Sequence, residues 1–166
     1  MTRELKLETL TADAFAPFGT MMDIAASELR LINGGTTERF HGLAMADTET
    51  GGGRTILSLF RGQPRVFPYA VDMMERHPLG SQTFFPVTEA DWIAVVAPDV
   101  DGRPGQPRAF LVPGHIGLQY DRNVWHHPLI AVGRVSDFLV MDREGDGVNL
   151  EEASYDEPYL IARPAN

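Results

Sequence analysis

The sequence predicts an all-β fold, an antiparallel β-barrel of the jelly-roll type with one or two short helices. Apolar segments recur about every 8 to 12 residues, a spacing typical of barrels and sandwiches. The segments between them are rich in Gly, Pro, Asp and Asn, which favour turns. Polar residues on the inward faces of two separate segments favour a barrel with a ligand cavity over a closed sandwich. At 166 residues the chain suits one domain, spanning residues 1–166.

The first third of the chain predicts one helical turn, one loop and one strand. Residues 11–17 resemble a capped turn, with Thr11 as the N-cap and Pro17 as the terminator. Residues 32–41, INGGTTERFH, contain a Gly pair that a helix or a central strand tolerates poorly, so we expect a loop. Residues 55–61 alternate and predict a strand that ends at Arg61.

The remaining segments predict strands, followed by a short helix. A strand from Phe67 is followed by a turn at residues 78–80 and a second strand, which together suggest a hairpin. Residues 90–98 are almost continuously apolar, as expected of a strand buried on both sides, with Trp92 in the core. Further strands are expected at 109–113, 117–120, 124–132 and 136–143. Residues 149–153 predict a last short helix, and the tail after Pro158 should be loose.

Ionisable residues end a segment that otherwise reads as a core strand. Side chains alternate along a strand, so Glu75 and His77 continue the face that carries the preceding odd-numbered apolar residues. Gln82 shares a face with Phe84 in the next segment. Burying such groups is costly unless they meet partners, a metal or a ligand. We therefore expect Glu75, His77 and Gln82 to line a common pocket.

A second polar group lies in residues 120–129, YDRNVWHHPL. In an extended strand His126 and His127 face opposite ways, so at most one of them joins the pocket. Both faces of this segment are apolar, and periodicity does not choose between them. For His127 we favour a structural histidine in the core, and for Trp125 a core position.

Composition limits the classes of partner. The net charge of −9 and the pI of about 4.9 argue against nucleic-acid and anionic membrane partners. There is no cysteine, so disulfides, Cys-type zinc sites and thiol catalysis are excluded. The N-terminal residues lack the apolar core of a secretory signal and no run is long enough to span a membrane, which predicts a cytoplasmic protein.

The polar motifs resemble a known superfamily. Glu75-x-His77, Gln82 and a distant His126 resemble the two short motifs of the cupins, with Glu75 where a His is usual and Gln82 where a Glu is usual. Over most of its length the chain resembles the ureidoglycolate lyase family, in the segments INGGTTERFH, SLFRGQPR, MMERHPLGSQTFFP, VVAPD, DGRPGQPRAF, RNVWHHPL and SDFLVMDREGDGVNLEE. The resemblance implies a homodimeric cupin-like β-barrel that cleaves (S)-ureidoglycolate into glyoxylate and urea, a step of allantoin breakdown.

The implied reaction assigns roles to the pocket residues. Release of urea needs a base, an acid and a group that holds the substrate carboxylate. His77, His126 and Glu75 are alternative bases, and we expect burial to raise the pKa of Glu75. Arg61 or Arg122 would hold the carboxylate. Gln82 or Asn33 would bind the urea end. Nickel or another divalent metal would be held by Glu75, His77, Gln82 and His126.

Several alternatives stay open on sequence alone. The chain could be another cupin enzyme acting on a small hydroxy or ureido acid, or a non-catalytic cupin that binds a small acid. Residues 32–41 are either a loop on the substrate side, donated across a dimer, or a loop packed at the barrel mouth. The acidic stretch 142–152 is best interpreted as a solvated face, because it lacks the ligand spacing of a calcium loop.

Overall fold

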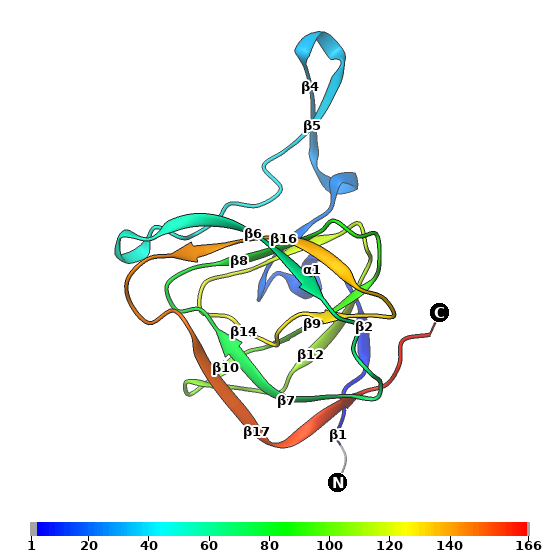
Figure 1. Ribbon diagram of the computed structural model, residues 1–166, viewed down its shortest axis with the longest axis vertical. Coiled ribbons are helices and arrows are strands. Elements are labelled where there is room, and N and C mark those ends of the chain that lie inside the picture. Colours follow the sequence, from blue (N-terminus) through cyan, green and yellow to red (C-terminus); the bar gives the residue numbers. More distant parts are fainter. Residues whose placement is uncertain (1–2, 166) are drawn as a thin grey trace.

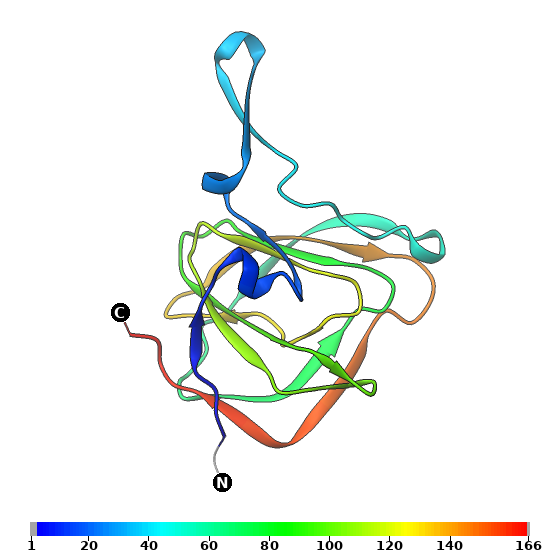
Figure 2. The ribbon, with the colours of Figure 1, turned by 180° about the vertical axis from the view of Figure 1, so that it is seen from behind.

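A computed structural model describes residues 3–165 and shows two sheets that close into a barrel (Figures 1 and 2). The larger sheet has the order β1 (Arg3–Glu4), β17 (Glu151–Ile161), β7 (Tyr69–Arg76), β14 (Trp125–His126), β9 (Trp92–Ala97), β12 (Arg108–Val112) and β2 (Leu7–Thr9), with β15 (Ile130–Ala131) paired to β9. The smaller sheet has the order β3 (Gly19–Met22), β13 (Gly117–Tyr120), β8 (Gln82–Pro86), β16 (Ser136–Glu144) and β6 (Arg54–Gly62).

The remaining elements are short. They are the strand pairs β4 (Glu28–Ile32) with β5 (Thr37–His41) and β10 (Asp99–Val100) with β11 (Arg103–Pro104), the helix α1 (Ala12–Phe15), and the 3-10 turns η1 (Ile24–Ala26), η2 (Asn33–Gly35) and η3 (Thr50–Gly52). Most strand pairs are antiparallel, and β1–β17 and β12–β2 are parallel. The predicted all-β barrel is confirmed. None of the helices between residues 3 and 165 is long and apolar enough to cross a membrane.

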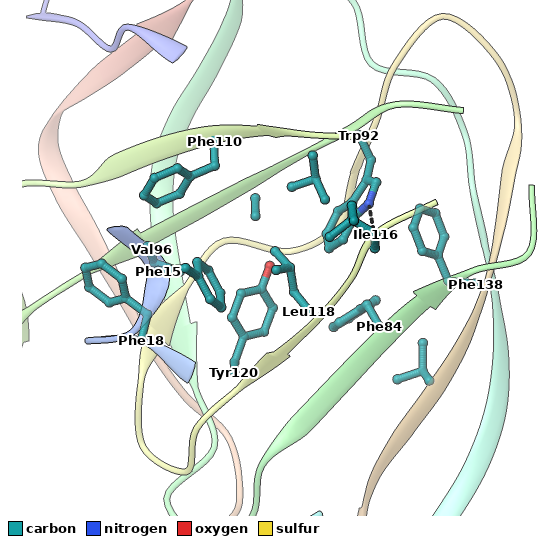
Figure 3. Packing of buried hydrophobic residues seen from close by; sticks show 13 residues of the cluster. Phe15, Phe18, Phe84, Trp92, Val96, Phe110, Ile116, Leu118, Tyr120 and Phe138 are labelled. Carbon is teal, nitrogen blue, oxygen red and sulfur yellow. Dashed lines mark hydrogen bonds between the residues drawn. The ribbon is translucent and has the colours of Figure 1, made fainter. Parts of the chain in front are cut away.

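The core between the sheets is aromatic (Figure 3). Phe138 has no exposed surface and packs edge-on against Trp92, with ring centroids 5.3 Å apart. Phe84 contacts both rings. Both tryptophans are buried, as predicted. Aromatic side chains bury large apolar areas, so this cluster makes the barrel a rigid scaffold for what it encloses.

Several local predictions are confirmed. The Thr11 side chain accepts a hydrogen bond from the Ala14 N–H and caps α1. All six residues of β9 are buried, as expected of a strand covered on both faces. The predicted strands at 55–61, 109–113, 117–120 and 136–143 correspond to β6, β12, β13 and β16. The segment 124–132 is divided into β14 and β15.

The predicted helix at 149–153 and the loose tail are wrong. Residues 151–161 form β17, which pairs with β7, and Ile161 is fully buried. Helix propensity is a weak preference that sheet pairing overrides. The pairing of β17 with β7 is irregular between Ser154 and Tyr159. Val71 and Met74 on β7 accordingly belong to one apolar cluster, so strict alternation does not hold along the whole strand.

The predicted hairpin after Phe67 is also wrong, and its failure matters for the site. β7 lies in the larger sheet and β8 in the smaller one. The segment between them crosses from one wall of the barrel to the other. Glu75 and Gln82 therefore face each other from opposite sheets, as inward side chains of two packed sheets do.

The loop expected at residues 32–41 is a projecting hairpin, which we call the arm (residues 28–41). β4 and β5 pair in antiparallel register, and the turn uses positive φ at Asn33, Gly34 and Gly35. Glycine adopts these angles without strain, so the Gly pair that weakened the strand prediction forms the turn. In Figure 1 the arm extends away from the barrel, on the side of β6 and β16.

Candidate functional site

Glu75, His77 and His126 meet inside the barrel. Their ligand atoms lie within 4.8 Å of one another. Glu75 on β7 is directly opposite His126 on β14 in the antiparallel pair, which places both side chains on the same face. Glu75 Oε1 lies 3.5 Å from His126 Nε2 and 4.0 Å from His77 Nε2. The structure thus brings together the three residues that the sequence predicted as catalytic.

Backbone carbonyls orient both imidazoles. His77 Nδ1 lies 2.7 Å from the Asn149 carbonyl oxygen, and His126 Nδ1 lies 2.9 Å from that of Val124. A carbonyl only accepts, so each Nδ1 carries the proton and donates it. Each Nε2 is then left with a lone pair directed toward the cluster. His77 Nε2 is buried and has no hydrogen-bond partner. A carbonyl behind Nδ1 is the usual support of a metal-binding histidine.

Gln82 completes the cluster from the opposite sheet. Its Oε1 lies 3.2 Å from His126 Nε2, so two acceptors face each other without a proton between them. Burial raises the pKa of Asp142, which lies beside this cluster, and the nearby Gln82 side chain partly offsets that rise. A divalent cation among the four groups would satisfy Glu75, both Nε2 atoms and the Gln82 oxygen, so the residues fit a metal.

The charge state of Glu75 differs from the expectation. Burial acts to raise its pKa, but the neighbouring imidazoles, His126 first and then His77 and His127, outweigh burial, and the net pKa is lowered. The expected rise is therefore wrong. Glu75 is a carboxylate at neutral pH, available as an anionic ligand or as a proton acceptor.

Tyr120 is a neighbour of the site that the sequence analysis did not select. Its ring stacks on His126, with centroids 4.4 Å apart and planes 13° apart. Burial, followed by the charge of Glu75, raises its pKa well beyond the ordinary range, so it stays a neutral phenol. Tyr120 is the first residue of the segment 120–129 that contains His126. This closeness in sequence was the only feature that could have pointed to Tyr120 as a neighbour of the site. Its ring fixes the plane of the imidazole.

His127 faces away from the cluster. Its Nδ1 donates to the Pro128 carbonyl oxygen at 2.7 Å, and its ring packs edge-on against Tyr69. Burial lowers its pKa and keeps it neutral. The two adjacent histidines take opposite sides, as an extended strand requires.

A cavity of about 500 Å³ opens onto the cluster. Glu75 and Gln82 lie on its wall, and the remaining lining residues are Phe60, Arg61, Gly62, Gln63, Arg65, Phe84, Pro128 and Leu129. A second hollow of about 330 Å³ is lined by His77, Gln82 and Asp142, among others. Gln82 lines both, so the cluster lies between the two hollows. Of the two, the larger one offers room and cations for an organic anion.

The arginines are distributed unevenly around this cavity. Arg61 lies at the rim and makes two hydrogen bonds, of 2.7 and 2.8 Å, to Asp137. Arg65 also lines the cavity, with its guanidinium 5.6 Å from the centre of the Tyr69 ring, and forms no ion pair with any residue in 3–165. Arg122 lies instead against Thr50 and Asp47. Asn33 is at the tip of the arm, where its side chain bonds Thr37.

The family model and the curated relatives agree on one family. The model of the family described as ureidoglycolate lyase matches residues 2–162. "Ureidoglycolate lyase 1" of Rhizobium meliloti (strain 1021) is 55% identical over 166 residues, covering 100% of this chain and 98% of the relative. "Ureidoglycolate lyase" of Rhizobium etli (strain CIAT 652) is 56% identical, with 100% of both chains covered. Among solved structures, a dTDP sugar isomerase from Desulfovibrio desulfuricans G20 aligns with a TM-score of 0.47 and 20% identity, over 78% of this chain and 83% of the isomerase.

Proposed function

The chain belongs to the ureidoglycolate lyase family, and we propose that the cluster of Glu75, His77 and His126 is where it cleaves (S)-ureidoglycolate into glyoxylate and urea. The protein is a carbon–nitrogen lyase that releases urea. The observation that carries the site assignment is the convergence of one carboxylate and two unprotonated imidazole nitrogens beside a cavity with cationic walls.

The reaction needs a proton to leave the carbinol hydroxyl while the departing nitrogen gains one. No covalent nucleophile is required. Glu75 is the acceptor we assign, because its lowered pKa keeps it ionised and its Oε1 lies within 4.0 Å of both Nε2 atoms. Return of the same proton to the nitrogen of urea completes the cycle. The carboxylate thus acts first as base and then as acid.

The residues that would hold a divalent metal are Glu75, His77, His126 and the Gln82 oxygen, and we propose nickel as the ion. Such an ion, when bound, lowers the pKa of a hydroxyl group that it contacts, which makes a weakly basic carboxylate sufficient as proton acceptor. Asn149 and Val124 keep the Nε2 lone pairs directed inward through their carbonyls. Tyr120 holds the His126 ring in plane.

The substrate carboxylate is assigned to Arg65 and Arg61. Arg65 has no acidic partner among the described residues, so its guanidinium is free for a bidentate contact. Arg61 shares its charge with Asp137 and adds a second cation at the rim. The Gln82 oxygen is assigned to the metal, so in this scheme Gln82 is not the group that binds the urea end. Arg122 and Asn33, which lie outside the cavity of their own chain, take no part in this scheme.

The resemblance to the family also supports two proposals about the assembly and location of the protein. We propose that it acts as a homodimer and that it works in the cytoplasm. Both can be measured without substrate.

The test is a coupled assay for glyoxylate and urea on metal-stripped and nickel-reloaded protein. His77→Ala and His126→Ala should each lose on the order of 10³-fold in rate while folding is intact. His115→Ala, at an exposed histidine, serves as the matched control and should keep the parent rate. Full activity of the metal-stripped protein would show that the reaction needs no metal. Full activity of both histidine variants would contradict the assignment of this cluster as the active site.

A further inference from the structure

The second hollow, of about 330 Å³, is polar and reaches the same cluster as the larger cavity. It touches the cluster through His77 and Gln82, and its wall also contains Asp142 and Asn149. The larger cavity touches the cluster through Glu75 and Gln82. A small molecule that is centred on the cluster can therefore extend into both hollows.

Asp142 faces into the barrel beside Gln82. β16 pairs with β8 so that Val140 lies opposite Phe84, and both side chains are buried in the aromatic core. The same register, continued by two residues, places Asp142 opposite Gln82 on this inward face. Asp142 Oδ1 is buried and accepts no hydrogen bond from any residue in 3–165. Leaving a buried acceptor unpaired is costly, so this oxygen calls for a donor from a ligand.

Asn149 supplies the complementary group on the wall of the same hollow. Its side-chain Oδ1 accepts a hydrogen bond of 2.8 Å from the Leu79 N–H. This bond fixes the orientation of the amide, and the NH₂ group has no hydrogen-bond partner among residues 3–165. An amide NH₂ group has two N–H donors and no acceptor. The hollow thus offers an acceptor at Asp142 and a donor at Asn149.

We propose that this hollow binds the ureido group of the substrate and then the urea that is released: Asp142 Oδ1 accepts a ureido N–H, and the Asn149 NH₂ group donates to the ureido carbonyl oxygen. The inference rests on the proposed function and assigns the urea end that the scheme above leaves open. A ureido group carries N–H donors and one carbonyl acceptor, so it needs both groups. With the substrate carboxylate at Arg65 and Arg61, the two ends of the molecule lie on either side of the cluster, and the carbon–nitrogen bond lies beside Glu75.

Urea binding is tested first, without turnover. Line broadening of isotope-labelled urea in NMR spectra should show binding to the nickel-loaded parent and to Asp146→Asn, the same substitution at an exposed neighbouring residue. Asp142→Asn should weaken binding by about tenfold or more, because a charged acceptor is lost. Asn149→Asp keeps the acceptor for the Leu79 N–H, removes the donors and should also weaken binding. No binding to the parent, or equal binding to the parent and both site variants, would overturn the proposal.

Steady-state kinetics give a second readout. Asp142→Asn should lower kcat/KM for (S)-ureidoglycolate on the order of 10- to 100-fold, because the site loses a charged partner for the ureido group. Inhibition by the product urea should need a correspondingly higher concentration. Inhibition by glyoxylate, which has no ureido group, should stay as in the parent. An equal weakening of inhibition by both products would contradict a separate site for urea.

Nickel affinity separates this role from metal binding. Asp142 is not among the residues whose ligand atoms lie within 4.8 Å of one another. Asp142→Asn should therefore keep the nickel affinity and the circular dichroism of the parent. A large fall in nickel affinity would make Asp142 a metal ligand and overturn the proposal.

The two proposals can fail separately. If the parent binds urea through Asp142 but does not cleave (S)-ureidoglycolate, the proposed function is wrong and the urea site stands. If the parent cleaves the substrate and Asp142→Asn does so at the same kcat/KM, the urea site is wrong and the proposed function stands.

Discussion

Two segments of the chain contain the same residue types but lie in opposite environments. The segment 73–86 carries Glu75, Arg76 and His77 and lies between the two walls of the barrel. The arm carries Glu38, Arg39 and His41 and extends into solvent in a single chain. The difference comes from what surrounds each segment. The first is flanked by buried strands, whereas the second pairs only with itself.

The comparison shows what makes ionisable residues into a site. In the barrel, backbone carbonyls fix the imidazole rings and burial removes competing water, so lone pairs converge on one point. In the arm, Glu28 and Arg30 pair with each other at the surface. Exposed pairs of this kind contribute little to stability. The barrel site is assembled within one chain from strands of both sheets, whereas the arm makes no such enclosure within residues 3–165.

The largest expected difference is in stability. Phe138→Ala removes a fully buried ring that packs on Phe84 and Trp92, and should cost about 3–5 kcal/mol in the free energy of unfolding. Leu31→Ala, in the exposed arm, should cost less than about 0.5 kcal/mol at protein concentrations where the chain is monomeric. Denaturant unfolding of both variants measures this contrast. Equal costs would mean that the arm belongs to the folded core.

Metal affinity should separate the two segments next. His77→Ala or His126→Ala should weaken nickel binding by at least about 100-fold, because an inward lone pair is lost. His41→Ala, in the arm, should leave affinity unchanged. Isothermal titration calorimetry on stripped protein gives all three values. Unaltered affinity in both barrel variants would place the metal elsewhere.

A smaller effect is expected at the helical turn α1, which follows β2. Thr11→Ala removes the cap on α1 and should cost about 1 kcal/mol in unfolding free energy. Thr11→Ser keeps the hydroxyl and should therefore keep most of the unfolding free energy that Thr11→Ala loses. Thermal or denaturant unfolding measures both. A loss that Thr11→Ser does not reverse would show that the methyl group, and not the cap, is responsible.

The smallest effect concerns two surface carboxylates. Hydrogen bonding to Arg108 lowers the pKa of Glu8, and bonding to Arg30 lowers that of Glu28. A lowered pKa in the folded state adds stability above the unfolded pKa, and that stability is lost as pH falls through the folded value. Glu8→Gln should therefore cost about 0.5 kcal/mol at neutral pH and nothing near pH 2, because the pair is largely exposed. Glu28→Gln should not change unfolding of the barrel at either pH.

The sequence predicted the residues of the site better than it predicted which strands pair. The prediction that Glu75 continues the face of Val71 is wrong, because Val71 and Met74 belong to one cluster and Glu75, next to Met74, points to the other face. The opposite faces of His126 and His127 followed from strand geometry alone. The sequence did not reveal that β7 and β8 belong to different sheets, because residues that favour a turn do not show which strands pair. The β17 strand was missed because its helix-compatible residues are overridden by pairing with β7. The arm was missed because a Gly pair marks a hairpin turn as readily as a loop.

The free arginine and the pKa of Glu75 were outside the reach of sequence reasoning. Both depend on neighbours that are distant in the chain. Arg61 pairs with Asp137 across a strand pair, whereas Arg65, on the same cavity wall, has no acidic partner among residues 3–165. The pKa of Glu75 falls because three imidazoles outweigh burial. The spacing of residues in the sequence does not show which of these opposing effects on the pKa is larger.

The most direct test of the account is the rate of urea release from (S)-ureidoglycolate by Glu75→Gln, measured on nickel-loaded protein beside the parent. The amide keeps the shape of the side chain and removes its charge and its ability to accept the proton. We predict a fall in kcat of about 10²- to 10⁴-fold with folding unchanged. A rate within a few-fold of the parent would contradict the assignment of this cluster as the site of cleavage.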